Sequence, residues 1–157
     1  MSLHSEVIKI VGTTAPKSTT DKHKRAKQIE SGIHKTQQKH ELHKWVLSCY
    51  LYQMKKHNLY NYLSGKIYSR SAFYDELGLP QSTARYYETL WEFYIEKHGL
   101  TVDNVMSADT HKLQRAVAFI KDKDTKDVRH TVELAERGRM SRDEFIDELK
   151  QLYGIQQ

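Results

Sequence analysis

The chain has 157 residues, a formal net charge of +5, two prolines, seven glycines and one cysteine. So few turn-forming residues argue against a β-rich protein, no apolar run approaches the roughly 20 residues that span a bilayer, and Cys49 has no second cysteine to pair with. We therefore expect one helical domain of a cytoplasmic protein, or of a protein inside a host cell, without a signal peptide or membrane contact.

The positive charge is concentrated in the first third of the chain. Residues 1–60 contain eleven Lys and Arg against four Asp and Glu, whereas residues 61–157 contain fourteen against sixteen. A basic block suits a polyanionic partner such as DNA, because cations that meet phosphates release counterions. A solvated basic helix face explains the same charge, and charge alone leaves both interpretations open.

The first 63 residues divide into a lead-in and a helical segment. Gly, Thr, Ser and Pro between residues 12 and 20 predict a flexible segment over 1–20, in which the apolar run 7–11 could form a strand without an evident partner. Residues 21–63 predict a long basic helix, or two helices broken near Gly32. One apolar stripe at three- and four-residue spacing predicts a buried face: Leu42, Trp45, Val46, Cys49 and Tyr52.

Residues 64–157 predict a helical domain. Ser69 or Ser71 can cap a short helix to about Leu77, the sequence 78–81 predicts a turn, and Ser82 can cap a helix over about 83–98. Three further helices are expected at about 108–121, 126–137 and 142–153, the last with a capping box of Ser141 and Glu144. The expected fold is an all-α bundle of five or six helices.

The segment 70–98 has the pattern of a helix-turn-helix, in which apolar residues fix two short helices at a steep angle around a tight turn. Gly78 provides the turn and Leu79 fills the corner, although Tyr74 stands where a small residue is usual. The predicted buried positions are Phe73, Leu77, Ala84, Tyr87 and Trp91.

The second helix would then present to the major groove the residue types that contact base edges and phosphates. The predicted DNA contacts are Gln81, Ser82, Thr83, Arg85, Tyr86 and Thr89, together with Ser71, Arg70 and Lys66. The predicted phosphate contacts of the basic helix are Lys22, Lys24, Arg25, Lys27, Lys35 and Lys39.

Five short motifs add a resemblance to a family. They are Leu59-Tyr60, Ser71-Ala72-Phe73, the turn sequence from Glu76 to Ala84, Lys112-Leu113, and the segment from Met140 to Glu144. Over about residues 44–149 the chain resembles uncharacterised helix-turn-helix proteins of phages and mobile elements, with Pro80 standing where those proteins tend to have Ser. The resemblance implies DNA binding in a regulatory or replication role.

Two groups of residues are candidates for metal binding, and neither pattern supports it. His40 and His43 share a helix face with His34 nearby, but a closed metal site needs more ligands, and Asp122, Asp124 and Asp127 alternate with lysines on an expected linker. We therefore expect a non-enzymatic, homodimeric protein that binds double-stranded DNA, with no metal or cofactor. A subunit that coats DNA without sequence choice is the first alternative, and a metal-dependent nuclease is the second.

Overall fold

The structure is a computed structural model that describes residues 2–36, 41–62 and 69–154. These residues contain nine α-helices and no strand, which confirms the all-α prediction but exceeds the five or six helices expected. The α-helices are α1 (Leu3–Val11), α2 (Thr19–Thr36), α3 (Glu41–Lys56), α4 (Arg70–Glu76), α5 (Gln81–Leu90), α6 (Val102–Val105), α7 (Thr110–Ile120), α8 (Thr125–Leu134) and α9 (Arg142–Tyr153). A 3₁₀ turn, η1 (Tyr60–Tyr62), and a π-helix, η2 (Trp91–Lys97), complete the order.

The chain divides into two compact units, residues 1–91 and 92–157. This division does not follow the boundary predicted near residue 63, because α4 and α5 belong to the first unit, where α5 packs along α3. The helix predicted to run to residue 98 keeps α-helical winding only as far as Leu90 and then continues as η2.

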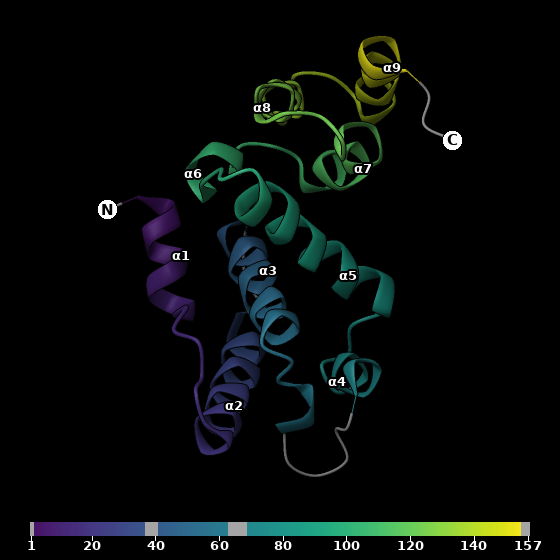
Figure 1. Cartoon of the computed structure of the whole chain (residues 1–157). Helices are drawn as coiled ribbons and strands as arrows, with labels where there is room; N and C mark the ends of the chain where they lie inside the picture. Colours follow the sequence, from purple (N-terminus) through teal and green to yellow (C-terminus); the bar gives the residue numbers. More distant parts are fainter. Residues whose placement is uncertain (1, 37–40, 63–68, 155–157) are drawn as a thin grey trace. The chain divides into compact units, whose positions relative to one another are not determined.

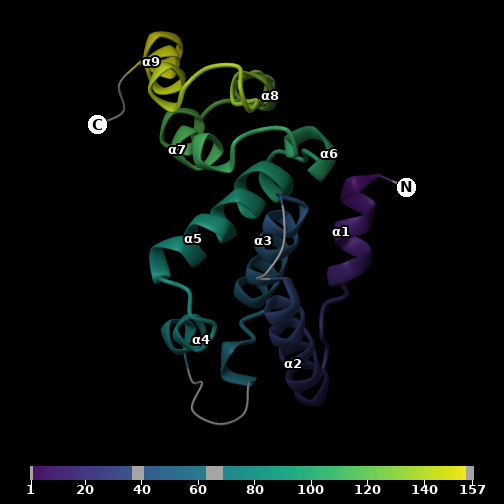
Figure 2. The same cartoon turned by 180° about the vertical axis from the view of Figure 1, so that it is seen from behind.

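Helix α3 is the centre of the first unit. Its side chains Trp45, Leu51 and Met54 are buried, and α1, α2 and α5 all pack against it. Figures 1 and 2 show α3 from opposite directions, with α1 and α5 on its two sides in both views. Residues on more than one face of α3 are buried for this reason.

The first helix differs from the flexible segment expected over residues 1–20. Ser2 caps α1 by accepting a hydrogen bond from the Ser5 amide at 3.0 Å, and Val7 and Val11 are buried on the side that packs on α3. An i, i+4 pair of valines matches the period of a helix rather than a strand, so the suggestion of a strand over 7–11 is also wrong.

Helix α2 runs through Gly32 without a break. Ala26, Ile29 and Ile33 form its buried face, and α2 packs against α3. A Cβ atom at Gly32 would overlap the ring and hydroxyl of Tyr50, which is 5% exposed. Glycine at this position allows the two helices to approach closely.

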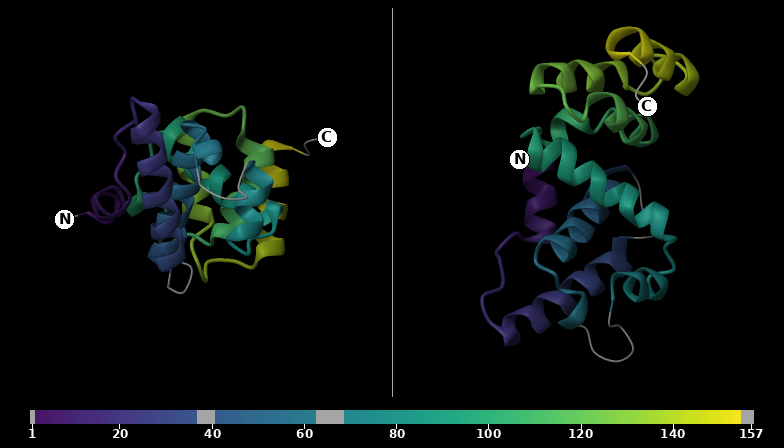
Figure 3. Two further views of the ribbon diagram at one scale, coloured as in Figure 1. Left: turned by 90° about the horizontal axis from the view of Figure 1, so that it is seen from below. Right: turned by 45° about the vertical axis from the view of Figure 1, so that its right-hand side comes forward.

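In the second unit, α7 packs against both α8 and α9 around Leu113, Val128 and Phe145. Figure 3 shows these three helices from two directions. The predicted capping box is confirmed: Ser141 Oγ accepts from the Glu144 amide at 3.1 Å, and Glu144 Oε1 accepts from the Ser141 amide at 3.3 Å.

We predict that Gly32→Ala destabilises the first unit by about 1–3 kcal/mol, because Tyr50 must move to admit the methyl group. Helix propensity alone predicts the opposite sign, a gain of roughly 0.5–1 kcal/mol. Urea unfolding of the variant and of Ser31→Ala, its exposed neighbour, measures the difference. A Gly32→Ala protein more stable than its parent would contradict the close approach of α2 and α3.

Candidate nucleic-acid interface

Helices α4 and α5 form a corner, the α4–α5 corner, over residues 69–90. Ser69 Oγ accepts from the Ala72 amide at 3.2 Å and so begins α4. Gly78 ends it with a φ of +70°, its amide donating to the Asp75 carbonyl at 3.0 Å, while the Leu79 amide donates to the Tyr74 carbonyl at 2.9 Å. These paired bonds are the Schellman arrangement, and they confirm the predicted left-handed turn.

Helix α5 begins at Gln81, so the prediction that Ser82 caps it is wrong. Pro80 is the N-cap residue, its ring holds φ at −57°, and no side chain caps the helix. The Gln81 side chain instead donates to Ser71 Oγ at 2.9 Å, which connects the starts of the two helices. The backbone amides of the first turn of α5 are therefore not used by a capping side chain.

The inner face of the corner matches the pattern expected from sequence in most positions. Phe73, Leu77 and Ala84 are buried, as is Trp91, whereas Tyr87 is only partly buried. Helix α4 lies beside the N-terminal end of α5 in Figures 1 and 2, and it packs against α5.

A buried carboxylate joins the two helices, and sequence reasoning missed it. Glu88 on α5 is 1% exposed; it forms an ion pair with Arg70, accepts a hydrogen bond from the Tyr74 hydroxyl, and lies 3.4 Å from the Tyr60 hydroxyl. Arg70 Nε also donates to the Tyr74 hydroxyl at 2.6 Å. The available signal was the position of Glu88 itself, four residues after Ala84 on the buried side of α5.

The surroundings of Glu88 disfavour its charge. Burial raises the pKa of the Glu88 carboxyl, and the Arg70 guanidinium beside it opposes that rise. Burial likewise raises the pKa of the Tyr60 hydroxyl, which therefore acts as a donor. Tyr74 fits the corner, where a small residue is usual, because its hydroxyl belongs to this network.

The outer face of α5 presents most of the predicted DNA contacts. Gln81, Ser82 and Arg85 are exposed, and Ser71 is exposed on α4. Thr83, Tyr86 and Thr89 are partly exposed. The Arg70 guanidinium is paired with Glu88, so its predicted DNA contact competes with an ion pair inside the protein and stays a prediction, and Lys66 lies outside the described residues.

Among the described residues, the cations predicted to contact phosphates lie on α2 and differ in their exposure and contacts. Lys24 and Lys27 are exposed, and the Lys22 ammonium lies 5.3 Å from the centre of the Tyr62 ring. Arg25 Nη2 donates to the carbonyls of Val11 at 2.8 Å and Gly12 at 2.6 Å and so holds the end of α1, while its predicted phosphate contact stays a prediction. The Lys35 side chain and Lys39 lie outside the described residues.

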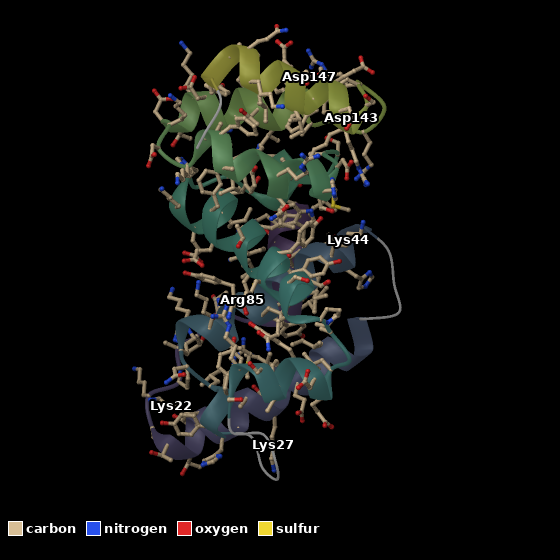
Figure 4. The ribbon with its side chains drawn as sticks, turned by 90° about the vertical axis from the view of Figure 1, so that its right-hand side faces the viewer. Lys22, Lys27, Lys44, Arg85, Asp143 and Asp147 are labelled. Carbon is tan, nitrogen blue, oxygen red and sulfur yellow. The ribbon has the colours of Figure 1, made fainter. Side chains whose placement is uncertain are left out.

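The described residues of the two predicted contact sets lie mainly on two different helices, α2 and α5. Helices α2 and α5 both pack on α3, and Figure 1 shows them on different sides of it. Figure 4 shows Arg85 projecting from α5, with Lys22 and Lys27 on α2 lower in the same view.

The aspartates and histidines considered as metal ligands do not form a metal site among the described residues. Asp124 caps α8, accepting from the Asp127 amide at 3.0 Å. The side chains of His34 and His40 lie outside the described residues, and among those described no group of three potential metal ligands is found. None of the described helices is both long and apolar enough to cross a bilayer.

No family model matches the sequence, and comparisons with curated proteins and with solved structures give no match.

We predict that Arg70→Ala destabilises the protein by about 1–3 kcal/mol, because a buried carboxylate loses its ion pair. Without Arg70, the pKa of the Glu88 carboxyl in the folded state would rise further above its unfolded value. The free energy of unfolding should therefore fall as pH rises through that folded pKa. The deficit measured by urea unfolding should therefore be larger at pH 8 than at pH 5. The exposed Arg85→Ala should change stability by less than about 0.5 kcal/mol at either pH; equal losses in the two variants would contradict the network.

A second prediction concerns the turn. Gly78→Val should lower stability by roughly 1–3 kcal/mol, since a β-branched residue is strained at positive φ. Nothing lies within 4 Å of the position of an added Cβ, so the loss comes from the backbone alone. Gly78→Asn, which tolerates this region, should lose clearly less in thermal unfolding. Similar melting temperatures for Val and Asn would rule out the left-handed turn in solution.

Proposed function

We propose that the first unit binds double-stranded DNA, with the α4–α5 corner acting as a helix-turn-helix and the start of α5 entering the major groove. The observation that carries the proposal is the exposed first turn and a half of α5, where Gln81, Ser82 and Arg85 project beside uncapped backbone amides. Amide, hydroxyl and guanidinium groups recognise base edges, and a helix N-terminus favours a phosphate.

The distribution of charge supports the first unit as the partner of an anion. Residues 1–91 contain fourteen Lys and Arg against seven Asp and Glu, whereas residues 92–157 contain eleven against thirteen. Exposed Asp75 and Glu76 lie at the end of α4 and would repel phosphates. We therefore place the duplex against the start of α5 rather than against the end of α4.

Binding of this kind is proposed without catalysis and as a homodimer. A ten-residue recognition helix contacts few base pairs and buries little surface, and a two-fold symmetric pair reading two half-sites raises both affinity and specificity. The role would be that of a regulator or replication accessory of a phage or mobile element.

A second candidate function follows from α2. Its exposed Lys24 and Lys27 contact no described acidic side chain by an ion pair, and they belong to a unit with excess positive charge. Such a surface could coat DNA through its phosphates without reading sequence.

We predict that Arg85→Ala weakens binding to a preferred duplex, selected from a random-sequence pool, by about 1–3 kcal/mol, and weakens binding to a random duplex much less. Fluorescence anisotropy with both duplexes measures the two affinities. Arg115→Ala, the same change at an exposed site on α7, controls for the loss of one charge. An equal loss on both duplexes would mean that Arg85 meets only phosphate.

The salt dependence separates the two candidate functions. If α5 carries the binding, the Lys24→Ala, Lys27→Ala double variant should keep the parent's slope of log affinity against log salt to within about one unit. If α2 coats DNA, each lost phosphate contact removes about 0.9 from the slope, so the double variant should flatten by nearly two. The flatter slope would favour non-specific coating of DNA by α2 over sequence-specific recognition by α5.

A further inference from the structure

The segment that connects α1 to α2 borders a hollow. A cavity of about 350 Å³ lies between residues 12–16 and the first turns of α2. Lys24 and Arg25 line it, with Asp21 as the acidic residue in its wall. The cavity therefore has more positive than negative charge, and it lies on a different side of α3 from α5.

Arg25 gives this cavity a fixed positive charge. Its two hydrogen bonds go to the neutral carbonyls of Val11 and Gly12, and its Nε atom is buried with no hydrogen-bond partner in the described part of the chain. Burial lowers the pKa of the guanidinium, and neither of these hydrogen bonds goes to a carboxylate. A partly buried charge of this kind is stabilised by a counter-ion.

We propose that this cavity binds a phosphate group, held by Lys24 and Arg25. The two cations outnumber the one carboxylate of Asp21 and so favour an anion, and Thr14 and Gln28, which also line the cavity, carry neutral donor groups suited to phosphate oxygens. A carboxylate has one charge and two oxygens, so it would use less of this donor set. The volume leaves room for a sugar beside the phosphate.

The site does not depend on DNA binding by α5. The phosphate can come from a free nucleotide, whose monoester carries up to two negative charges, or from a nucleic-acid backbone, whose diester carries one, and both offer phosphate oxygens to Lys24 and Arg25. A bound phosphate would connect α2 to the segment after α1, because Arg25 already holds the carbonyls at the end of that helix.

Calorimetric titration of the full chain with inorganic phosphate and with adenosine monophosphate, at constant ionic strength, tests the site. We expect saturable binding of both, with acetate binding much more weakly. Lys24→Ala should weaken phosphate binding by about tenfold or more, the effect of one charged hydrogen bond. Lys22→Ala removes the same charge two residues away, where the side chain lies over Tyr62 and does not line the cavity, and should change binding by less than about twofold.

Absence of saturable phosphate binding would overturn the proposal, and so would equal binding by the parent and Lys24→Ala. An equal loss in Lys22→Ala would overturn it as well, because it would reveal diffuse charge rather than a site. Displacement of adenosine monophosphate by a short duplex assigns the site to backbone phosphate, and simultaneous binding assigns it to a free nucleotide. Neither result depends on Arg85, so failure of this site leaves the proposed role of α5 intact.

Discussion

The buried carboxylate of Glu88 controls how the α4–α5 corner is built. Removing it from water is costly, and the structure offsets the cost with an arginine from α4, a tyrosine from α4 and a tyrosine from η1. Three consecutive segments, η1, α4 and α5, must therefore hold fixed positions around one side chain. The direction of α5, and with it the surface that α5 presents to solvent, depends on that arrangement.

The three arginines of residues 1–91 show how the first unit divides its cations between structure and surface. Arg70 compensates Glu88, and Arg25 binds the carbonyls at the end of α1, so both contribute to the fold. Arg85 alone of the three is exposed. A planar guanidinium with several donors suits the two internal roles better than lysine does. The count of basic residues therefore overstates the positive charge available to a partner, and exposed lysines supply most of the rest.

Features carried by local sequence could be predicted, and features that depend on distant contacts could not. Helical periodicity gave the all-α class, positive φ at Gly78 followed from the turn sequence, and the Ser141 capping box begins α9 as expected. Arg70 and Glu88 are 18 positions apart, and the helical spacing of apolar residues does not predict their ion pair. Helix α1 has only nine residues, and its valines acquire a partner only when α3 is in place. Helix α5 begins at Gln81, earlier than predicted, because the ring of Pro80 fixes φ at the N-cap position. The prediction from Ser82 considers only side-chain caps.

Backbone amide chemical shifts followed by NMR during titration with a preferred duplex test the central claim most directly, that the exposed start of α5 is the DNA-binding surface. The account predicts that the largest changes fall on residues 81–86 and on neighbouring Ser71, whose side chain already bonds to Gln81. Amides of α7 to α9 should change little. Changes concentrated on α2 or in the second unit, with α5 unaffected, would contradict the assignment of α5 as the recognition helix.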